Sequence, residues 1–108
     1  MTFCIFYITC PDESTAHQIG QHLLEHRLAA CYNAFPITSG YWWQGMMQRD
    51  EEWVCVAKTS ERQAAALEQA VLGIHPYELP CVMRWSVTAN EAYARWIEEE
   101  TVGQPQAG

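Results

Sequence analysis

Residues 40–59 have the sequence GYWWQGMMQRDEEWVCVAKT, and with the residues before them from Cys31 they predict one unusually long β-ribbon. Residues 31–59 are rich in Val, Tyr, Trp and Thr, and the best turn-forming residues lie at mid-length, from Gly45 to Asp50. Each arm then approaches about twelve residues, against about 5 to 6 for a usual strand. A small domain cannot cover such a ribbon alone, and proteins cover or pair exposed tryptophans and unpaired backbone groups. The ribbon therefore predicts self-assembly.

The length and composition restrict the possible functions. The chain has 108 residues, 49% of them hydrophobic, which predicts one folded domain over residues 1–102 and a flexible tail over 103–108. Its 13 acidic and 6 basic residues give a formal charge of -7, which repels a phosphate backbone, so we expect no nucleic-acid partner. No apolar stretch approaches the ~20 residues of a membrane-spanning helix, and no apolar leader follows Met1. We expect neither membrane contact nor export.

The five cysteines indicate the redox compartment. Their number is odd, and four of them lie in or beside apolar, strand-like runs, where a reduced cysteine packs as a small hydrophobic residue. This pattern predicts a cytoplasmic protein.

The segments on either side of the ribbon predict further strands and a helix. Residues 3–9 are continuously apolar, which is typical of a central strand that is covered on both faces. Residues 13–27 carry apolar side chains at helical spacing, and Asp12 is the expected cap of this helix. Residues 81–87 predict a fourth strand.

Two more helices are predicted from capping residues and apolar stripes. Ser60 and Gln63 fit a capping box at the start of the second helix, and Gly73 is its expected end. Asn90 is expected to cap a short last helix. The side chains of that helix expected to face inward are Tyr93, Trp96 and Ile97.

This order of elements predicts an α+β fold of the ferredoxin-like βαββαβ(α) type, with an antiparallel sheet and a long β-hairpin. Right-handed crossovers place both main helices on one face of the sheet. The other face then has no helices of its own and needs polar residues or a partner.

Six short motifs occur in order along nearly the whole chain, to about Ile97. They are TCPD at 9–12, LAACYN at 28–33, SGYWWQG at 39–45, Glu52 with Lys58-Thr59, HPY at 75–77 with Pro80, and Tyr93 with Trp96-Ile97. Any one of them is weak evidence, but six in this order are specific. By these motifs the chain resembles the CutA family of divalent-cation tolerance proteins.

The resemblance implies a cytoplasmic homotrimer with PII-like architecture, whose long hairpins embrace neighbouring subunits. It also implies a link to tolerance of copper and other divalent cations, with no obligatory cofactor and with copper or another divalent metal ion as a possible ligand. The family's biochemical activity is unsettled. The chain has no Gly-rich phosphate loop, nucleophile elbow or HExxH motif, so we expect no enzyme.

Four residues are candidate metal ligands, each with a structural alternative. In the family, copper chemistry is associated with histidines at the turn that holds His75 and with a cysteine in the first strand. In this chain Ile8 occupies the position of that cysteine. His75 either binds a metal ion or orders the turn. His22 and His26 share one helix face and either hold two positions around Cu(II), Ni(II) or Zn(II), or are solvated boundary residues. Cys31 is either a soft ligand for Cu(I) or a packed thiol.

Four further residues match positions that look like the lining of the family's inter-subunit cleft: Trp43, Glu52, Lys58 and Tyr77. Together they could orient an anionic or metal-bound small ligand. Alternatively, Glu52 and Lys58 lie on one strand face and pair across strands. Trp42 and Trp43 must point to opposite faces of their strand, so one can pack in the core while the other contacts a neighbouring subunit.

Two functional hypotheses follow. The first is a homotrimeric cytoplasmic protein that binds copper or other divalent cations and contributes to metal tolerance. In this hypothesis His75 is the main ligand, and a thiol or groups from another subunit complete the site. The second is a PII-like signalling or scaffold trimer that binds a small effector or partner protein in its inter-subunit clefts.

Overall fold

The structure is a computed structural model that describes residues 1–102. Its elements are β1 (Thr2–Cys10), α1 (Glu13–Glu25), β2 (Cys31–Trp43), β3 (Met46–Thr59), the 3₁₀ turn η1 (Glu61–Gln63), α2 (Ala64–Ile74), β4 (Val82–Thr88) and α3 (Glu91–Glu100). The predicted βαββαβ order with an added helix is confirmed. The tail predicted over residues 103–108 lies outside the described residues. No helix within residues 1–102 is long and apolar enough to cross a membrane.

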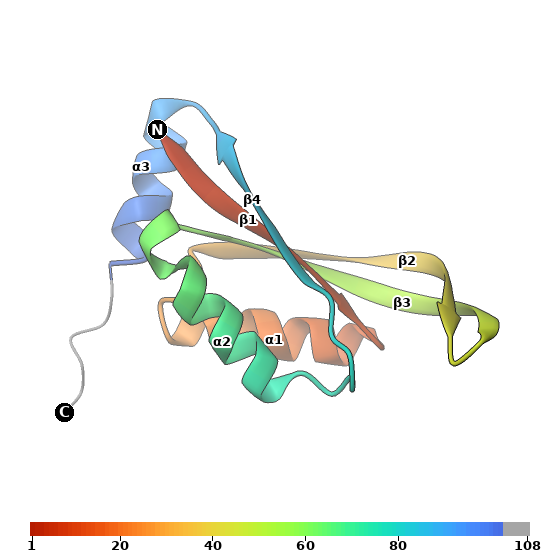
Figure 1. The fold of residues 1–108 in the computed structure, drawn as a ribbon. Helices are drawn as coiled ribbons and strands as arrows, with labels where there is room; N and C mark the ends of the chain where they lie inside the picture. The colour runs from red at the N-terminus through yellow and green to blue at the C-terminus, as the bar shows by residue number, and fades with distance from the viewer. Residues whose placement is uncertain (103–108) are drawn as a thin grey trace.

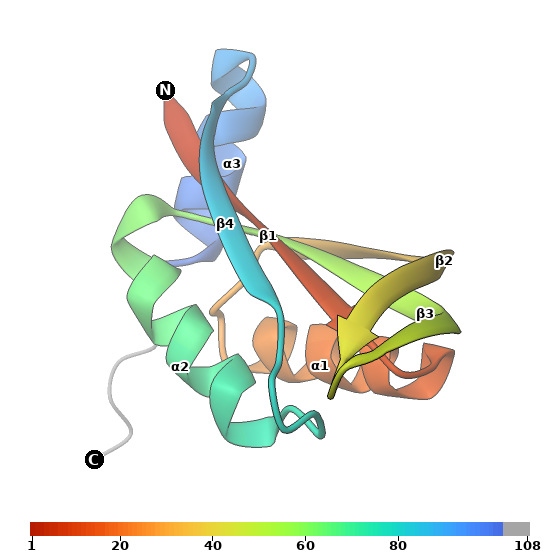
Figure 2. The same ribbon diagram turned by 45° about the vertical axis from the view of Figure 1, so that its right-hand side comes forward.

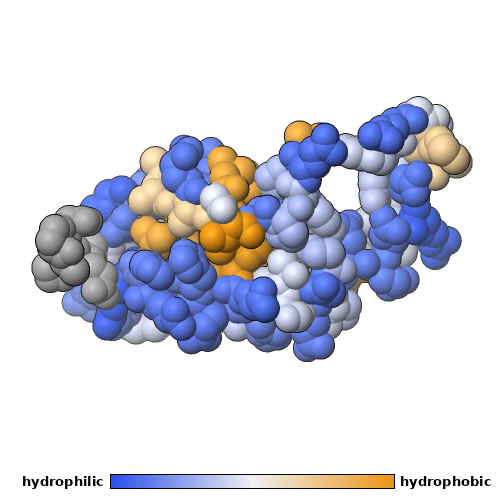
Figure 3. Space-filling model, turned by 90° about the horizontal axis from the view of Figure 1, so that it is seen from below, coloured by the Kyte–Doolittle hydropathy of each residue, from blue (hydrophilic) through white to orange (hydrophobic). Residues whose placement is uncertain are grey.

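The four strands form one antiparallel sheet in the order β2-β3-β1-β4, with β1 at its centre as predicted. Figure 1 shows α1 and α2 along one face of this sheet. Alternate residues of β1 point to that face, and they are fully or nearly fully buried against both helices. The β1 residues in this core are Cys4, Phe6, Ile8 and Cys10. Seen from below in Figure 3, this face of the molecule is mostly hydrophilic, and its main hydrophobic area lies left of the middle of the view.

The last helix covers one end of the opposite face. Phe3 of β1 packs there against Ala94 and Ile97 of α3 in a second buried cluster, close to the N-terminus in Figure 2. The prediction that this face has no helix of its own is therefore wrong at this end. Trp96, which was expected to face inward, is 40% exposed. Ala94 and Ile97 are three residues apart and share the buried stripe, so the intervening Trp96 points away from it.

The β2–β3 hairpin is as long as predicted, with strands of 13 and 14 residues, and it projects from the rest of the molecule (Figure 1). Its turn is the pair Gln44 and Gly45, with φ of 51° and 79°. Positive φ at both positions characterises the two-residue turn whose twist matches that of the strands. The turn predicted over Gly45–Asp50 is therefore displaced, because Asp50 already pairs with Ser39 in the ladder.

The helix starts agree only in part with the predicted caps. Asp12 caps α1 as expected, since its Oδ1 atom accepts a hydrogen bond of 2.8 Å from the Thr15 amide, which lowers the pKa of Asp12. The capping box at Ser60 is wrong. The Ser60 hydroxyl makes no cap bond and accepts instead from the Thr101 hydroxyl at 3.0 Å, inside the protein. Gln63 donates to the Thr101 carbonyl oxygen at 3.0 Å.

Two other helix ends also differ from expectation. Asn90 is the N-cap residue of α3, as predicted, but its side chain makes no hydrogen bond to the first turn of the helix. Gly73 does not end α2, which continues to Ile74, and His75 then takes an extended conformation. That change of direction starts the connection between α2 and β4, which lies at the C-terminal end of β1.

Candidate functional site

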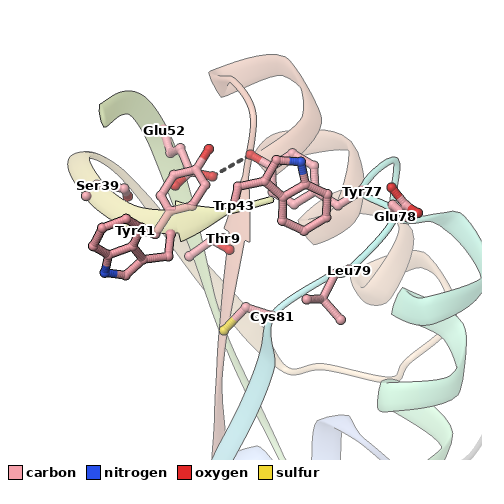
Figure 4. Close-up of a pocket in the computed structure, with 11 residues that line it drawn as sticks. Thr9, Ser39, Tyr41, Trp43, Glu52, Tyr77, Glu78, Leu79 and Cys81 are labelled. Carbon is pink, nitrogen blue, oxygen red and sulfur yellow. Dashed lines mark hydrogen bonds between the residues drawn. The ribbon is translucent and has the colours of Figure 1, made fainter. Parts of the chain in front are cut away.

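A pocket of about 510 Å³ lies between the β2–β3 hairpin and the connection from α2 to β4 (Figure 4). The hairpin contributes three aromatic side chains to its lining, Tyr41, Trp42 and Trp43. The connection contributes Tyr77, Glu78 and Leu79. The pocket is therefore lined largely by aromatic groups and is formed within a single chain.

Glu52 of β3 supplies the buried charge of this pocket. Thr9 of β1 pairs with Val54, and side chains of a strand alternate, so Thr9, Val54 and Glu52 share the sheet face that points away from α1 and α2. Glu52 is only 9% exposed. The Tyr77 hydroxyl donates a hydrogen bond to one carboxylate oxygen, Oε2 (Figure 4). Burial, together with this bond to Glu52, raises the pKa of Tyr77, so the phenol stays protonated and remains a donor.

His75 holds the connection against β1. Its Nε2 atom lies 2.8 Å from the Thr9 carbonyl oxygen, which can only accept, so Nε2 carries the proton. Its Nδ1 atom accepts from the Tyr77 amide at 3.1 Å. Both ring nitrogens are thus engaged, and a metal ion at His75 would have to displace one of these bonds. In this structure His75 orders the turn that places Tyr77.

Three of the four residues expected to line a cleft come together here: Trp43, Glu52 and Tyr77. Lys58 does not join them, because it lies near the other end of β3, with its Nζ atom 3.3 Å from the Tyr93 hydroxyl. At about 3.3 Å per residue it is about 20 Å along the strand from Glu52. A cleft that contains all four residues would need Lys58 from a neighbouring copy.

Three further residues that line the pocket were not predicted: Tyr41, Glu78 and Leu79. Tyr41 is two residues from Trp43 on the same strand, so the strand period placed it on the same face and could have identified it. Glu78 and Leu79 lie in an irregular connection, where no periodic pattern predicts which way a side chain points.

Cys31 lies away from the pocket, beside Lys58 and the α3 helix. Its Sγ atom is 3.4 Å from the Tyr93 hydroxyl, and the residue is only partly exposed. Lys58 also lies 5.5 Å from the centre of the Tyr93 ring. Cys31, Lys58 and Tyr93 therefore form a separate polar cluster under one end of α3.

The two histidines of α1 are neighbours, as their spacing predicts. The ring centres of His22 and His26 are 4.3 Å apart. His26 Nδ1 lies 2.9 Å from the His22 carbonyl oxygen and must donate to it, so its Nε2 atom carries the lone pair that can bind a metal. Within residues 1–102, however, no group of three or more His, Cys, Asp or Glu is placed to hold a metal ion. The pair supplies at most part of a site in one chain.

Known proteins resemble this chain over nearly its whole length. The sequence profile of the family described as CutA1 divalent ion tolerance protein matches residues 4–100. The divalent-cation tolerance protein CutA of Thermotoga maritima is 40% identical over 91% of this chain and 98% of its own length. That of Pyrococcus horikoshii is 37% identical over 90% and 96%.

Solved structures agree with the fold. The crystal structure of the divalent ion tolerance protein CutA1 from Ehrlichia chaffeensis superposes with a TM-score of 0.89 at 29% identity, over 93% of this chain and 95% of that one. A protein of Archaeoglobus fulgidus, described as the periplasmic divalent cation tolerance protein CutA, gives a TM-score of 0.87 at 34% identity, over 94% and 99%.

Proposed function

Because the chain belongs to the CutA1 divalent ion tolerance protein family, we propose that it is a non-enzymatic, cytoplasmic homotrimer that acts in the response to divalent metal ions and binds copper or another divalent cation itself. The family membership supports the link to metal tolerance. The resemblance predicted from the six sequence motifs is thereby confirmed at the level of the family.

The exposed end of the hairpin supports assembly into a trimer. Trp42 is 72% exposed and Met47 is 76% exposed, and these two residues are paired across the hairpin near its turn. Trp43 and Met46, the next pair, are also exposed. Large apolar side chains gathered at one end of a projecting ribbon favour contact with further copies of the chain. We propose that each hairpin contacts a neighbouring subunit.

The main support for direct metal binding is the pair of neighbouring histidines on α1, His22 and His26. Two imidazoles at adjacent positions on one helix face suit Cu(II) or Zn(II), with water or a second copy supplying the remaining ligands. His75 is the alternative ligand, at the cost of one of its two hydrogen bonds. Cys31 is an alternative for Cu(I), at the cost of its contact with Tyr93.

The cysteines support the proposed cytoplasmic location. All five are free, and three of them are buried among apolar side chains. A chain whose cysteines pack as thiols suits a reducing compartment. The description of the A. fulgidus relative gives a periplasmic location for that protein.

Native mass spectrometry during a titration with Cu(II) and then Zn(II) tests this proposal. The protein is reduced beforehand, and the reductant is removed. We expect a trimer that takes up metal in steps of three and loses this uptake in His22→Ala and His26→Ala. His17→Ala is the matched control, because it removes a histidine from the same helix. Loss of uptake in His75→Ala alone would assign the site to that turn, and no uptake at all would refute direct binding.

The pocket favours a second function, binding of a small effector by a PII-like trimer. Its volume of about 510 Å³ falls within the range of about 300 to 1,000 Å³ typical of small-ligand sites. A partner protein that inserts a side chain there is the related possibility. A ligand at 100 times its dissociation constant stabilises the native state by about 2.7 kcal/mol, so a thermal-shift screen of metabolites detects it. A flat response across the screen would count against this function.

A further inference from the structure

We propose that His22 and His26 of α1 form one half of a zinc site, and that the same pair from a second copy of this chain, in another trimer, forms the other half. The zinc ion then joins the two trimers through four imidazoles. This inference rests on the proposed function, direct metal binding by this pair. It adds the metal, the number of protein ligands and the partner that completes the site.

The two rings are already arranged as half of a metal site. Their positions, four residues apart, place both on one face of the helix, and their centres are 4.3 Å apart. His26 Nδ1 donates to the His22 carbonyl oxygen at 2.9 Å. Metal-bound histidines usually donate one ring N–H to such a carbonyl, which fixes the ring and leaves the other nitrogen for the metal. His26 therefore has the hydrogen bond of a metal ligand without any metal bound.

A single chain does not complete the site. Within residues 1–102, no group of three or more His, Cys, Asp or Glu is placed to hold a metal ion. Zinc sites without an open position have four protein ligands in a tetrahedron. The chain has four histidines, and the other two have different contacts: His17 lies 2.8 Å from the Tyr32 hydroxyl, and both ring nitrogens of His75 are engaged. The imidazoles best placed to fill the open positions are the same pair in another copy.

The proposed trimer leaves this pair accessible. Lys58 is six residues from Glu52 on β3, so its side chain points to the sheet face opposite α1, and a neighbouring hairpin that reaches Lys58 approaches that face. The turn of the chain's own hairpin also lies far away. The 13 residues of β2 start beyond the last turn of α1 and carry the turn about 40 Å from there, at about 3.3 Å per residue (Figure 1). His26 is exposed and His22 is partly exposed.

Two-fold symmetry gives the contact its ligand count. In a two-fold contact the same patch of surface occurs on both partners, so each copy contributes the same two histidines to one zinc ion. A trimer carries three such pairs, each of which can meet a pair of another trimer. The expected products are therefore two joined trimers and, with more bridges, larger assemblies.

The net charge makes the contact depend on the metal. Each chain has a formal charge of -7, so two trimers repel each other. Zinc brings two positive charges to the contact, and salt at physiological ionic strength screens the remaining repulsion beyond about 8 Å. Four imidazoles leave no coordination position for water, as in structural zinc sites. Joined trimers thus withhold zinc from the solution, which is a direct form of metal tolerance.

Sedimentation velocity of the concentrated full chain during a titration with zinc chloride tests the proposal. The protein is first reduced and treated with EDTA, and both reagents are removed. Magnesium chloride is the matched salt, because Mg²⁺ has the same charge and prefers oxygen ligands and water. We expect the mass of the assembly to double or more as zinc approaches one ion per two chains. We expect no change with magnesium, and a return to the starting mass after EDTA is added.

Matched variants locate the bridge. His22→Ala and His26→Ala are each expected to abolish the increase in mass, whereas His17→Ala, which removes a histidine from the same helix, keeps it. A mixing experiment tests whether both partners supply ligands. Fluorescently labelled protein that lacks both His22 and His26 is mixed with unlabelled wild type and zinc, and its label is expected to stay at the starting mass. Far-UV circular dichroism verifies that each variant is folded.

Native mass spectrometry of the dilute protein separates this inference from the proposed function. If trimers take up zinc through the pair but the concentrated protein does not gain mass, direct metal binding survives and the bridge is refuted. If the trimers take up no zinc and no mass is gained, both are refuted. An equal gain in mass with magnesium or in His26→Ala also overturns the inference, because it places the association elsewhere on the surface. Joining of the labelled double variant to wild type overturns it as well, because one copy then supplies all the ligands.

Discussion

His75 joins the end of β1 to the connection after α2, because its Nε2 atom donates to the Thr9 carbonyl oxygen at a distance of 2.8 Å. The same ring accepts from the amide of Tyr77, whose hydroxyl in turn donates to Glu52. A chain of hydrogen bonds thus runs from the centre of the sheet to the pocket. The histidine that the family resemblance marks as a metal ligand is, in this structure, a positioning residue for the pocket.

Replacement of His75 by alanine is expected to destabilise the protein by about 1–3 kcal/mol, because it removes two hydrogen bonds and leaves two backbone groups without partners. Urea unfolding followed by circular dichroism measures the change. His26→Ala is the control. It removes one exposed bond to its own helix and is expected to cost less than about 1 kcal/mol. Equal effects of the two substitutions would show that the His75 bonds do not hold the connection.

Gly20 lets α1 approach β2 closely. A Cβ atom at this position would lie 2.5 Å from ring atoms of Tyr32, so Gly20→Ala must push the ring or the helix away. We expect a loss of about 1–3 kcal/mol in the free energy of unfolding. Gly73→Ala in α2 is the matched control, since nothing lies within 4 Å of its added Cβ, and it is expected to stabilise by about 0.5–1 kcal/mol. A gain from both substitutions would contradict the close packing at Tyr32.

The turn of the hairpin depends on residues that accept positive φ. Gly45 has a φ of 79°, so Gly45→Ala is expected to lower stability by about 1–2 kcal/mol. Gln44→Asn is expected to raise it by a few tenths of a kcal/mol up to about 1, since asparagine tolerates this conformation better. Gly40→Ala is the control, because its added Cβ would meet only the Gln48 carbonyl oxygen at 3.9 Å. Melting temperatures that move equally in the two glycine variants would refute the turn assignment.

The buried thiols predict a loss of stability in alkaline solution. Burial, followed by the negative charges of Asp12 and Glu52, raises the pKa of Cys10 from 9.0 to about 11. Burial and the neighbouring Cys10 raise the pKa of Cys55 from 9.0 to about 12. Between pH 9 and these values the unfolded chain loses thiol protons that the folded chain keeps, so the free energy of unfolding falls as the pH rises.

The slope of this decline is about 1.4 kcal/mol per pH unit for each thiol. Urea unfolding at a series of pH values measures it. Cys55→Ala is expected to make the decline between pH 9 and 11 shallower, whatever it does to stability at neutral pH. An unaltered slope in Cys55→Ala would contradict the raised pKa.

Most of the fold could be predicted because its signals are local. The continuous apolar run of β1 and the strand-forming composition of residues 31–59 each identify their element without reference to the rest of the chain. The capping box at Ser60 was wrong because Thr101, 41 residues later, provides a competing hydrogen-bond partner that no local pattern reveals. The turn was displaced because Gln44 adopts a conformation that its residue type does not favour.

The pocket was predicted only in part for a similar reason. Motif positions identified Trp43, Glu52 and Tyr77, and the structure brings them together. The strand period placed Glu52 and Lys58 on one face, but a shared face does not imply proximity, and their separation along β3 keeps them apart. The directions in which the side chains of the connection after α2 point depend on the hydrogen bonds of His75 to Thr9 and Tyr77. A local sequence pattern does not reveal such bonds.

The central position of β1 has a consequence for how the protein is made. Thr2–Cys10 is synthesised before both of its partners, residues 53–59 and 82–88. The apolar strand therefore has no partner until residues 53–59 have been synthesised, and its second edge stays unpaired until residues 82–88 follow. Contacts between such distant segments close slowly, so the nascent chain exposes an aggregation-prone strand during translation. The complete sheet can form only after β4 has emerged, so we expect β1 to be protected late in the folding of this domain.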